Sequence, residues 1–324
     1  MNTLEIIRQP ILAEIEEYRK LFESTLYNRN ELLNSVLSYI GQRKGKMMRP
    51  LLVLLMAREA GTISAASFHS AVTLELLHTA SLVHDDIVDE SDERRGQASV
   101  NAVFDNKMAV LVGDYLLSSA LEQASFSGDI RIVQKISSLG KSLSEGEMLQ
   151  LSNIQNETFT EEAYLAVINQ KTAALFAASA ELGALSVGAS DEFIEKAYKF
   201  GQIVGICFQI KDDIFDYSVS SEIGKPTGND MLEGKLTLPA IYVLNTTQNE
   251  EMLALAAKIK EGVATDSEIA KLVDFTKRNG GIEYAEQVME RYCEQGMELL
   301  SDFKDVEVKR SLTEYLNFVV GRTM

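Results

Sequence analysis

Proline is nearly absent from the middle of this chain, and this absence limits the folds open to it more than any other feature. The 324 residues include four prolines, and residues 51–225 contain none. Proline ends or kinks a helix because it lacks a backbone N–H and its ring clashes with the preceding turn. A proline-free stretch of this length therefore accommodates a series of long helices.

Apolar residues in this stretch recur every three or four positions, which is the helical period. The segments are Leu51–Ala60, Ser64–Asp89, Val110–Ser125, Ile130–Leu151, Glu161–Leu185 and Asp191–Asp216. Short breaks containing Gly or Ser separate several of them, and alternating β patterns are missing. Ser64 and Asp191 are expected to cap two of the helices. We predict an all-α fold and, because no linker divides the chain, a single domain over residues 1–324.

The charge balance excludes one class of function. The chain has 31 Lys+Arg against 48 Asp+Glu, so its net charge is 31 − 48 = −17. An acidic protein is repelled by nucleic-acid backbones and by anionic lipid surfaces, and we therefore expect no nucleic-acid partner. The two cysteines, Cys207 and Cys293, form no CxxC pair, so neither a zinc ribbon nor a disulfide framework is expected.

No targeting or membrane segment is apparent. The N-terminus lacks a basic region followed by a long apolar core, and together with the scarce cysteines this predicts a cytoplasmic protein. The most membrane-like stretch, Thr172–Ser190, is rich in Ala, Gly and Ser and includes Glu181. We interpret it as a closely packed buried helix and not as a membrane span.

Two similar acidic clusters each end an apolar segment. The first is Asp85-Asp86-x-x-Asp89 and the second is Asp212-Asp213-x-x-Asp216. On a helix the first and last aspartates of such a cluster lie about 40° apart and one turn apart, with the middle aspartate on the adjoining flank. Each cluster is therefore expected to present three carboxylates toward one side.

Carboxylates packed this closely repel one another unless a cation neutralises them. Ligands that are all oxygen indicate a hard metal, and the loop pattern of an EF-hand is absent. Mg²⁺ commonly takes one or two carboxylates and completes its shell with water and substrate phosphate oxygens. Two such clusters could together hold several Mg²⁺ ions around a diphosphate.

Basic residues accompany the acidic clusters, as expected of partners for phosphate oxygens. Lys46 and Arg49 are three positions apart and are expected on one face of a starting helix. The others lie near one cluster or the other: Arg94, Arg95, Lys171, Lys225 and Lys235.

The sequence resembles the trans-isoprenyl diphosphate synthases of the polyprenyl synthetase family, from about Lys46 to Arg322. Within that family it is most similar to the octaprenyl and other long-chain synthases. The shared motifs are Gly45-Lys46-x-x-Arg49-Pro50, His78 through Asp85-Asp86-x-x-Asp89, Arg94-Arg95-Gly96, Gly113-Asp114, Glu145-Gly146-Glu147, Lys171-Thr172-Ala173, Gln209-x-x-Asp212-Asp213-x-x-Asp216, Gly224-Lys225-Pro226 and Gly234-Lys235. In many relatives the first motif reads Gly-Gly-Lys-Arg, whereas this chain has Lys44-Gly45-Lys46-Met47 and so lacks one basic group.

This resemblance implies a fold, two substrates and a role for each group of motif residues. The fold is a single helical bundle of the isoprenoid synthase type around a central apolar cavity. The two aspartate triads would bind three Mg²⁺ around the diphosphate of an allylic substrate. The residues that would assist there are Arg94, Lys171, Gln209, Lys225 and Lys235. The residues that would hold the diphosphate of isopentenyl diphosphate are Lys46, Arg49, His78 and Arg95.

The implied reaction is a sequential head-to-tail condensation. Pyrophosphate departs from the allylic substrate, the double bond of isopentenyl diphosphate attacks the resulting carbocation, and a proton then leaves. Thr172 and Gln209 correspond to family positions that stabilise the cation. No protein nucleophile is required, which agrees with the lack of a Ser/His/Asp or Cys/His arrangement.

Product length is predicted from the residues that precede Asp85. The family controls length at the positions four and five residues before the first aspartate, where a bulky aromatic shortens the tunnel. Here these positions hold the small residues Ser81 and Ala80, and Leu77 and Leu74 continue the stripe for about 16 Å of helix axis. We expect a C30–C50 product, with octaprenyl diphosphate as the best single prediction.

Two alternatives remain open. One is a short-chain synthase that makes farnesyl or geranylgeranyl diphosphate. The other is a non-catalytic regulatory subunit of a heteromeric prenyl synthase, although such subunits typically lose aspartates and all six are present here. The resemblance also implies a homodimer, formed through the apolar helices after Arg95. Transient membrane contact during product release is left open.

Overall fold

The computed structural model describes residues 2–42, 45–94, 96–155, 160–218 and 227–322. Within these ranges the secondary structure is helical apart from one short hairpin, in which β1 (Glu93–Arg94) pairs antiparallel with β2 (Gln97–Ala98). The all-α prediction is therefore confirmed. Two residues that the sequence analysis assigned to diphosphate binding, Arg95 and Lys225, lie outside the described residues.

The chain divides into two compact units, so the expectation of one domain over residues 1–324 stays a prediction. The first unit comprises Met1–Lys141, Leu175–Gly201 and Asp302–Tyr315. Its complete helices are α1 (Thr3–Arg8), η1 (Gln9–Ile11), α2 (Leu12–Thr25), α3 (Glu31–Gly41), α4 (Met48–Ala60), α5 (Ala65–Val88), α6 (Val100–Phe104) and α7 (Asn106–Phe126). It also contains β1 and β2.

The second unit comprises Ser142–Ala174, Gln202–Ser301 and Leu316–Met324. Its complete helices are α9 (Glu161–Ile168), the π-helical turn η2 (Asn169–Ala173), α12 (Asn229–Leu232), α13 (Leu238–Thr247), α14 (Glu250–Lys260), α15 (Asp266–Arg278) and α16 (Gly281–Leu299). Four further helices contribute residues to both units: α8 (Ile130–Gln155), α10 (Ala174–Leu185), α11 (Asp191–Asp216) and α17 (Val306–Gly321).

Most of the predicted helical segments are single helices in the structure. α11 has the predicted bounds, and α5 begins after Ser64, whose capping box confirms it as an N-cap. α11 differs in its cap: the Phe193 backbone N–H donates to Oγ of Ser190, 3.3 Å away, so Ser190 precedes Asp191 as the capping residue. The segment predicted from Glu161 to Leu185 is interrupted by η2, where the backbone widens to π-helical spacing.

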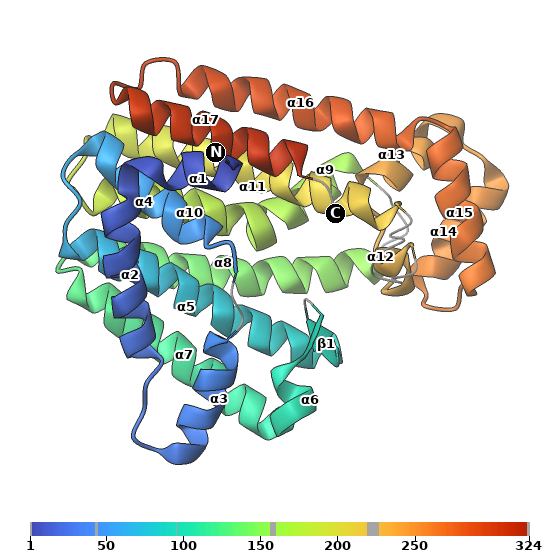
Figure 1. Ribbon diagram of the computed structural model, residues 1–324. Helices are drawn as coiled ribbons and strands as arrows, with labels where there is room; N and C mark the ends of the chain where they lie inside the picture. Colours follow the sequence, from blue (N-terminus) through green and yellow to red (C-terminus); the bar gives the residue numbers. More distant parts are fainter. Residues whose placement is uncertain (1, 43–44, 95, 156–159, 219–226, 323–324) are drawn as a thin grey trace. The chain divides into compact units, whose positions relative to one another are not determined.

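The core of the first unit contains helical segments that are buried on all sides. α5 packs along α7, as Figure 1 shows, and α4 packs against α5. Every residue from Leu51 to Ala57 in α4 is buried, which is typical of a helix enclosed by its neighbours. Leu175–Leu185 in α10 is equally buried, as predicted from its small residues. None of the described helices is both long and apolar enough to cross a membrane.

The core of the second unit gathers apolar side chains from α12, α13, α14 and α15. Met231 of α12, Leu244 of α13, Met252 of α14 and Leu272 of α15 are at most 3% exposed and belong to one cluster. Tyr217, the residue that follows α11, lies in the same cluster. The end of α11, which carries the second aspartate motif, is therefore anchored by a buried aromatic ring.

Candidate active site

The first aspartate motif lies at the C-terminal end of α5, as predicted. Asp85 is half-buried, and Asp89 is exposed and caps the helix. Asp86 differs from both because it is only 1% exposed. The structure thus departs from the expectation that all three carboxylates point to one side: the middle one is turned into the protein.

The hairpin that follows α5 brings a basic residue back onto this motif. Arg94 of β1 donates from Nε to Oδ1 of Asp86. The Ser91 backbone N–H donates to the Asp86 carbonyl oxygen, 2.9 Å away, which folds the chain back over the end of the helix. The short β1–β2 pairing was not predicted, but its effect is local: it fixes Arg94 beside the buried aspartate.

A glycine on α7 makes room for the histidine that precedes the motif. A Cβ atom added at Gly113 would lie 2.2 Å from Nε2 of His84, a separation that real side chains do not reach. The same imidazole nitrogen lies 3.4 Å from Oδ1 of Asp114. The Gly113-Asp114 motif therefore has a physical reason: the glycine admits the ring, and the aspartate lies within ion-pairing distance of it.

The second motif ends α11 and repeats the pattern of the first. Asp212 and Asp216 are half-buried, and the middle residue, Asp213, is only 3% exposed. Burial, followed by the charge of Asp230, raises the pKa of Asp213 well above its ordinary value. In both motifs the first and last carboxylates are the more accessible ones, and the middle one is held inside the protein.

Three side chains surround Asp213 in a continuous hydrogen-bond chain. Tyr164 of α9 donates to Oδ2 at 2.6 Å, and Gln209 donates from Nε2 to Oδ1 at 2.8 Å. The Thr172 hydroxyl donates to Oε1 of Gln209 at 2.7 Å. Gly205 lets η2 approach α11 this closely, because a Cβ there would lie 2.4 Å from Cα of Ala173. The structure therefore brings the predicted residues Thr172, Gln209 and Asp213 together.

Asp216 caps the segment that follows it, and there it meets a carboxylate that the sequence analysis missed. Its Oδ1 accepts from the Asn229 backbone N–H at 2.9 Å, and its Oδ2 from the Asp230 backbone N–H at 3.2 Å. Burial, followed by the charge of Asp216, raises the pKa of Asp230 to about 7. The available signal was an acidic residue 14 positions after the motif, in the sequence Gly228-Asn229-Asp230.

Two of the predicted diphosphate-binding residues in the second unit are paired with carboxylates. Lys171 lies 2.5 Å from Oε2 of Glu147, within the Glu145-Gly146-Glu147 motif, and Lys235 pairs with Glu233. On binding a diphosphate, either lysine would exchange its glutamate partner for a phosphate oxygen. This exchange conserves charge pairing, so it costs less than desolvating a bare ammonium group.

The predicted residues for the second substrate lie in and before α4 and on α5. α4 begins at Met48, so Arg49 is in its first turn and Lys46 precedes it, and the expectation that both lie on one helix face was wrong. Met47 between them adopts a left-handed conformation. The Arg49 guanidinium lies 4.8 Å from the centroid of the Phe176 ring, and His78 is 8% exposed on α5.

The donor set suits a hard cation, although it is not preassembled. Across the described ranges, no three His, Cys, Asp or Glu side chains are gathered as a metal site. Burial, and then the charges of neighbouring carboxylates, raise the pKa values of Asp213 and Asp230, and a divalent cation would relieve the repulsion between these carboxylates. The available ligands are the carboxylate oxygens of the accessible first and last aspartates, and oxygen ligands of this kind fit Mg²⁺.

The residues predicted to set product length lie along α5. Leu74, Leu77 and Ala80 are at most 3% exposed, and Ser81 is half-buried. Ser81 donates its hydroxyl proton to the His78 carbonyl oxygen at 2.9 Å, so its polarity is satisfied within the helix. From Leu74 to Val83 this helix contains no phenylalanine, tyrosine or tryptophan.

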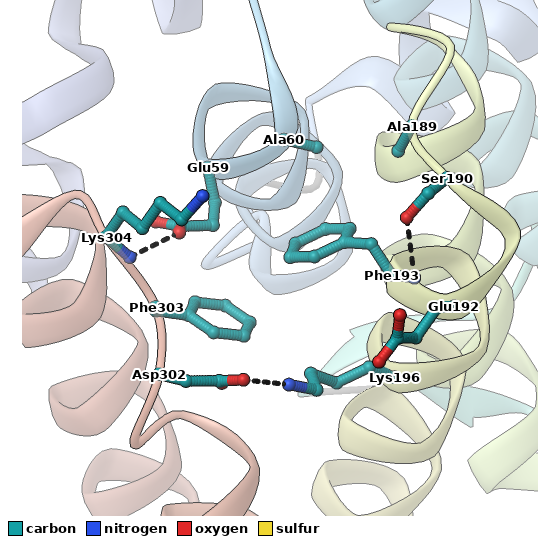
Figure 2. A pocket seen from close by; sticks show the side chains of 10 residues that line it. All are labelled: Glu59, Ala60, Ala189, Ser190, Glu192, Phe193, Lys196, Asp302, Phe303 and Lys304. Atoms are coloured by element: carbon teal, nitrogen blue, oxygen red, sulfur yellow. Dashed lines mark hydrogen bonds and ion pairs between the residues drawn. The ribbon is translucent and has the colours of Figure 1, made fainter.

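A separate cavity of about 330 Å³ lies in the first unit, and none of the predicted site residues lines it (Figure 2). Figure 2 shows Lys196 and Asp302 pointing toward each other, and their ion pair is 2.5 Å long. Glu59 accepts from the Lys304 backbone N–H at 2.7 Å. These contacts join the end of α4, the start of α11 and the segment before α17. We therefore assign the residues around the cavity a structural role.

The all-α fold and the two aspartate motifs agree with the family that comparison with known proteins finds. The sequence model of the Polyprenyl synthetase family matches residues 30–276. The chain belongs to this family and is a trans-prenyltransferase. The recognition made from the sequence motifs is thereby confirmed.

Individual relatives differ in the product that their names state. Heptaprenyl diphosphate synthase component 2 of Geobacillus stearothermophilus is 36% identical, over 96% of this chain and 95% of its own. A crystal structure of geranylgeranyl pyrophosphate synthase from Bacteroides thetaiotaomicron is 50% identical in sequence. It has a TM-score of 0.88 and covers 99% of this chain and 100% of its own. A polyprenyl synthase from Caulobacter crescentus CB15, complexed with calcium and isoprenyl diphosphate, is 27% identical, with a TM-score of 0.91 over 98% of each chain.

Proposed function

We propose that the chain is an all-trans polyprenyl diphosphate synthase that adds isopentenyl diphosphate units to an allylic diphosphate, with Mg²⁺ as its metal. The observation that carries this proposal is the repeated arrangement at the ends of α5 and α11. In each, an aspartate triad has accessible outer carboxylates and a buried, hydrogen-bonded middle carboxylate. The family is metal-dependent, which supports this use of the triads.

The outer aspartates Asp85, Asp89, Asp212 and Asp216 would hold the metal, and Asp86 and Asp213 would support them from within. Bound Mg²⁺, three ions by the family resemblance, would supply charge that stabilises the departing pyrophosphate. Arg94 and Lys171 would assist, each turning from its carboxylate partner toward a phosphate oxygen. Lys225 and Lys235 are proposed for the same role on the resemblance alone.

Thr172 is placed to stabilise positive charge without a negative side chain. Its hydroxyl proton is committed to Oε1 of Gln209, so the lone pairs of its oxygen remain available to a carbocation. Gln209 is committed to Asp213 through its amide nitrogen. For the second substrate, we assign the diphosphate of isopentenyl diphosphate to Lys46, Arg49, His78 and Arg95, following the resemblance.

The length of the product depends on the tunnel beside α5. The small Ala80 and Ser81 and the aliphatic Leu77 and Leu74 support a product of C30–C50, with octaprenyl diphosphate as our specific proposal. The heptaprenyl name of the Geobacillus relative supports a product longer than C20.

Geranylgeranyl diphosphate is the second candidate product. The Bacteroides structure, which shares half of its residues with this chain, carries that name. A residue from another helix that closes the tunnel below Ala80 would produce this outcome. Product sizing distinguishes the two candidates directly.

We propose a homodimer in which α7 contributes to the interface. This helix exposes four aliphatic side chains: Val110, Leu111, Leu117 and Leu121. The word "component" in the Geobacillus name supports testing a heteromeric alternative as well. A mass of twice 35.9 kDa for the purified chain, measured by light scattering, would support the dimer, and a monomer would contradict it. A cytoplasmic location remains part of the proposal.

The proposed chemistry is tested by incubating the protein with labelled isopentenyl diphosphate, farnesyl diphosphate and Mg²⁺. We expect label to enter an organic-soluble prenyl product and expect chelation of the metal to abolish this. Asp85→Ala and Asp213→Ala should each lower turnover by about 100-fold or more. Asp266→Asn, at the exposed start of α15, is the control and should retain wild-type turnover. Wild-type turnover in both alanine variants would contradict the proposal.

A further inference from the structure

Tyr164 makes a short, buried hydrogen bond to the middle aspartate of the second motif. The side chain is 8% exposed, and its hydroxyl lies 2.6 Å from Oδ2 of Asp213. A bond this short is typical of a hydroxyl that donates to a carboxylate. Burial, followed by the charge of Asp213, raises the pKa of Tyr164 well above its ordinary value, so the phenol keeps its proton.

The rest of the network leaves Asp213 little freedom to rotate. Its second oxygen accepts from Gln209, and the Thr172 hydroxyl fixes which end of the Gln209 amide faces Asp213. Both carboxylate oxygens are therefore bonded to donors from inside the protein. Gln209 lies one helical turn before Asp213 on α11, whereas Tyr164 reaches it from α9. Tyr164 is thus the contact through which a second helix orients this carboxylate.

The orientation of Asp213 bears on its neighbours because all of them lie in the last turns of one helix. Asp212 and Asp216 precede and follow it, and they are the accessible carboxylates of the motif. Rotation or fraying of the last turn of α11 would displace both. A bond from α9 to Asp213 resists that displacement.

We propose that Tyr164 is a positioning residue for the second aspartate motif, acting through Asp213 on the binding of Mg²⁺ and the allylic diphosphate. This inference rests on the proposed function, because it assigns the second motif to metal and diphosphate. Loss of a residue that supports a metal ligand typically lowers metal affinity by 10- to 100-fold, and because Tyr164 acts through Asp213, we expect an effect at the lower end of this range. No role at the isopentenyl diphosphate subsite is assigned to it.

Tyr164→Phe removes the hydroxyl and keeps the ring, and the chain offers a matched control. Tyr284 of α16 donates to Oε2 of Glu161 at 2.7 Å, so Tyr284→Phe deletes another phenol–carboxylate bond to the same helix α9. The first readout is the rise in melting temperature when Mg²⁺ is titrated in the presence of inorganic pyrophosphate. The second is the KM of each substrate at saturating Mg²⁺.

We expect Tyr164→Phe to need about 10-fold more Mg²⁺ than wild type for half of the stabilisation, and to show a higher KM for farnesyl diphosphate. The KM for isopentenyl diphosphate should stay within about 2-fold, and Tyr284→Phe should match wild type in every readout. An Mg²⁺ requirement in Tyr164→Phe equal to wild type, or an equal change in Tyr284→Phe, would overturn the proposal.

Action through Asp213 is tested in the same titration by a second background. In Asp213→Ala, which removes both acceptor oxygens, adding Tyr164→Phe should change the Mg²⁺ requirement by less than about 2-fold, and a further 10-fold change would overturn the proposal. Should Tyr164→Phe fail to fold, Thr172→Val is the second variant. It removes the hydroxyl that bonds to Gln209 at the other end of this hydrogen-bond network, and we expect it to raise the Mg²⁺ requirement. An unchanged requirement there would likewise overturn it.

Failure of the inference and failure of the proposed function give different results. If wild type itself shows no stabilisation by Mg²⁺ and pyrophosphate and no condensation, the proposed function fails. If wild type shows both and Tyr164→Phe behaves like wild type, only the inference fails.

Discussion

Arg322 pairs with Asp212, the first aspartate of the second motif, across 2.7 Å between its Nη2 and Oδ1 of the carboxylate. The guanidinium carbon lies 3.9 Å from the centroid of the Phe208 ring, and the same Nη2 donates to the Phe208 carbonyl oxygen at 2.6 Å. Three contacts therefore hold one side chain, just past the end of α17, against the helix that carries the motif.

A double-mutant cycle measures what this pair contributes to stability. The Arg322 side chain is 14% exposed and that of Asp212 is 42% exposed, so solvent screens the pair only in part. We expect Arg322→Met and Asp212→Asn to couple by about 1 kcal/mol in urea unfolding. Changes that add to within about 0.3 kcal/mol would show that the pair contributes nothing beyond the separate packing of each side chain.

Gly113→Ala tests the close approach of α7 to His84. The added Cβ would lie 2.2 Å from the imidazole nitrogen, so the ring must move or the helices must separate. We expect a net destabilisation of about 1–3 kcal/mol. Gly140→Ala in α8 is the control, because nothing lies within 4 Å of its added Cβ and helix propensity alone favours alanine by about 1 kcal/mol. Equal effects of the two substitutions would contradict the proposed steric role.

Ala80→Phe tests the proposed tunnel. The residue is 2% exposed on α5, five positions before Asp85, and an aromatic ring there should block growth of the chain. We expect shorter products, with condensation of the first units within about 10-fold of the wild-type rate. Ala65→Phe adds the same ring at the exposed start of α5 and should leave product length unchanged. An unchanged product distribution in Ala80→Phe would mean that this residue does not line the tunnel.

Asp230 predicts a dependence of stability on pH in the metal-free protein. Its pKa is raised to about 7, whereas in the unfolded chain it ionises near its ordinary value of about 4. Between these values the folded state holds a proton that the unfolded state has lost, so stability falls as the pH rises through that window. Asp230→Asn removes this penalty.

The melting temperature of Asp230→Asn, relative to wild type, should therefore increase by a few degrees from pH 5 to pH 8, since 1 kcal/mol corresponds to roughly 2–4 °C in a domain of 150–250 residues. Glu290→Gln, at an exposed position on α16, removes a charge without burial and should show no such trend. A gap for Asp230→Asn that is constant with pH would contradict the assignment.

Much of the fold could be predicted because its signals are local. The spacing of apolar residues predicted α5 and α11 almost to the residue, and α11 begins at Asp191 and ends at Asp216. The π-helical turn η2 was not predicted, because no glycine or proline interrupts the sequence from Glu161 to Ala173. The β1–β2 hairpin was missed because two residues per strand leave no alternating pattern.

The sequence predicted which residue types form the candidate site, but not which of its carboxylates are buried. Spacing alone placed three carboxylates of each motif on one side, whereas Asp86 and Asp213 are buried and bonded to Arg94 and Tyr164. Burial of a carboxylate depends on donors that other segments bring to it. Tyr164 precedes Asp213 by 49 positions, so no local pattern could reveal their contact.

The size of the product tests the central claim most directly. Purified protein is incubated with farnesyl diphosphate, Mg²⁺ and an excess of isopentenyl diphosphate, and the dephosphorylated products are sized by chromatography against prenyl alcohol standards. The account predicts products between C30 and C50, with C40 dominant. A distribution that ends at C20 would contradict the long-chain assignment, and an absence of any elongated product would contradict the proposed condensation itself.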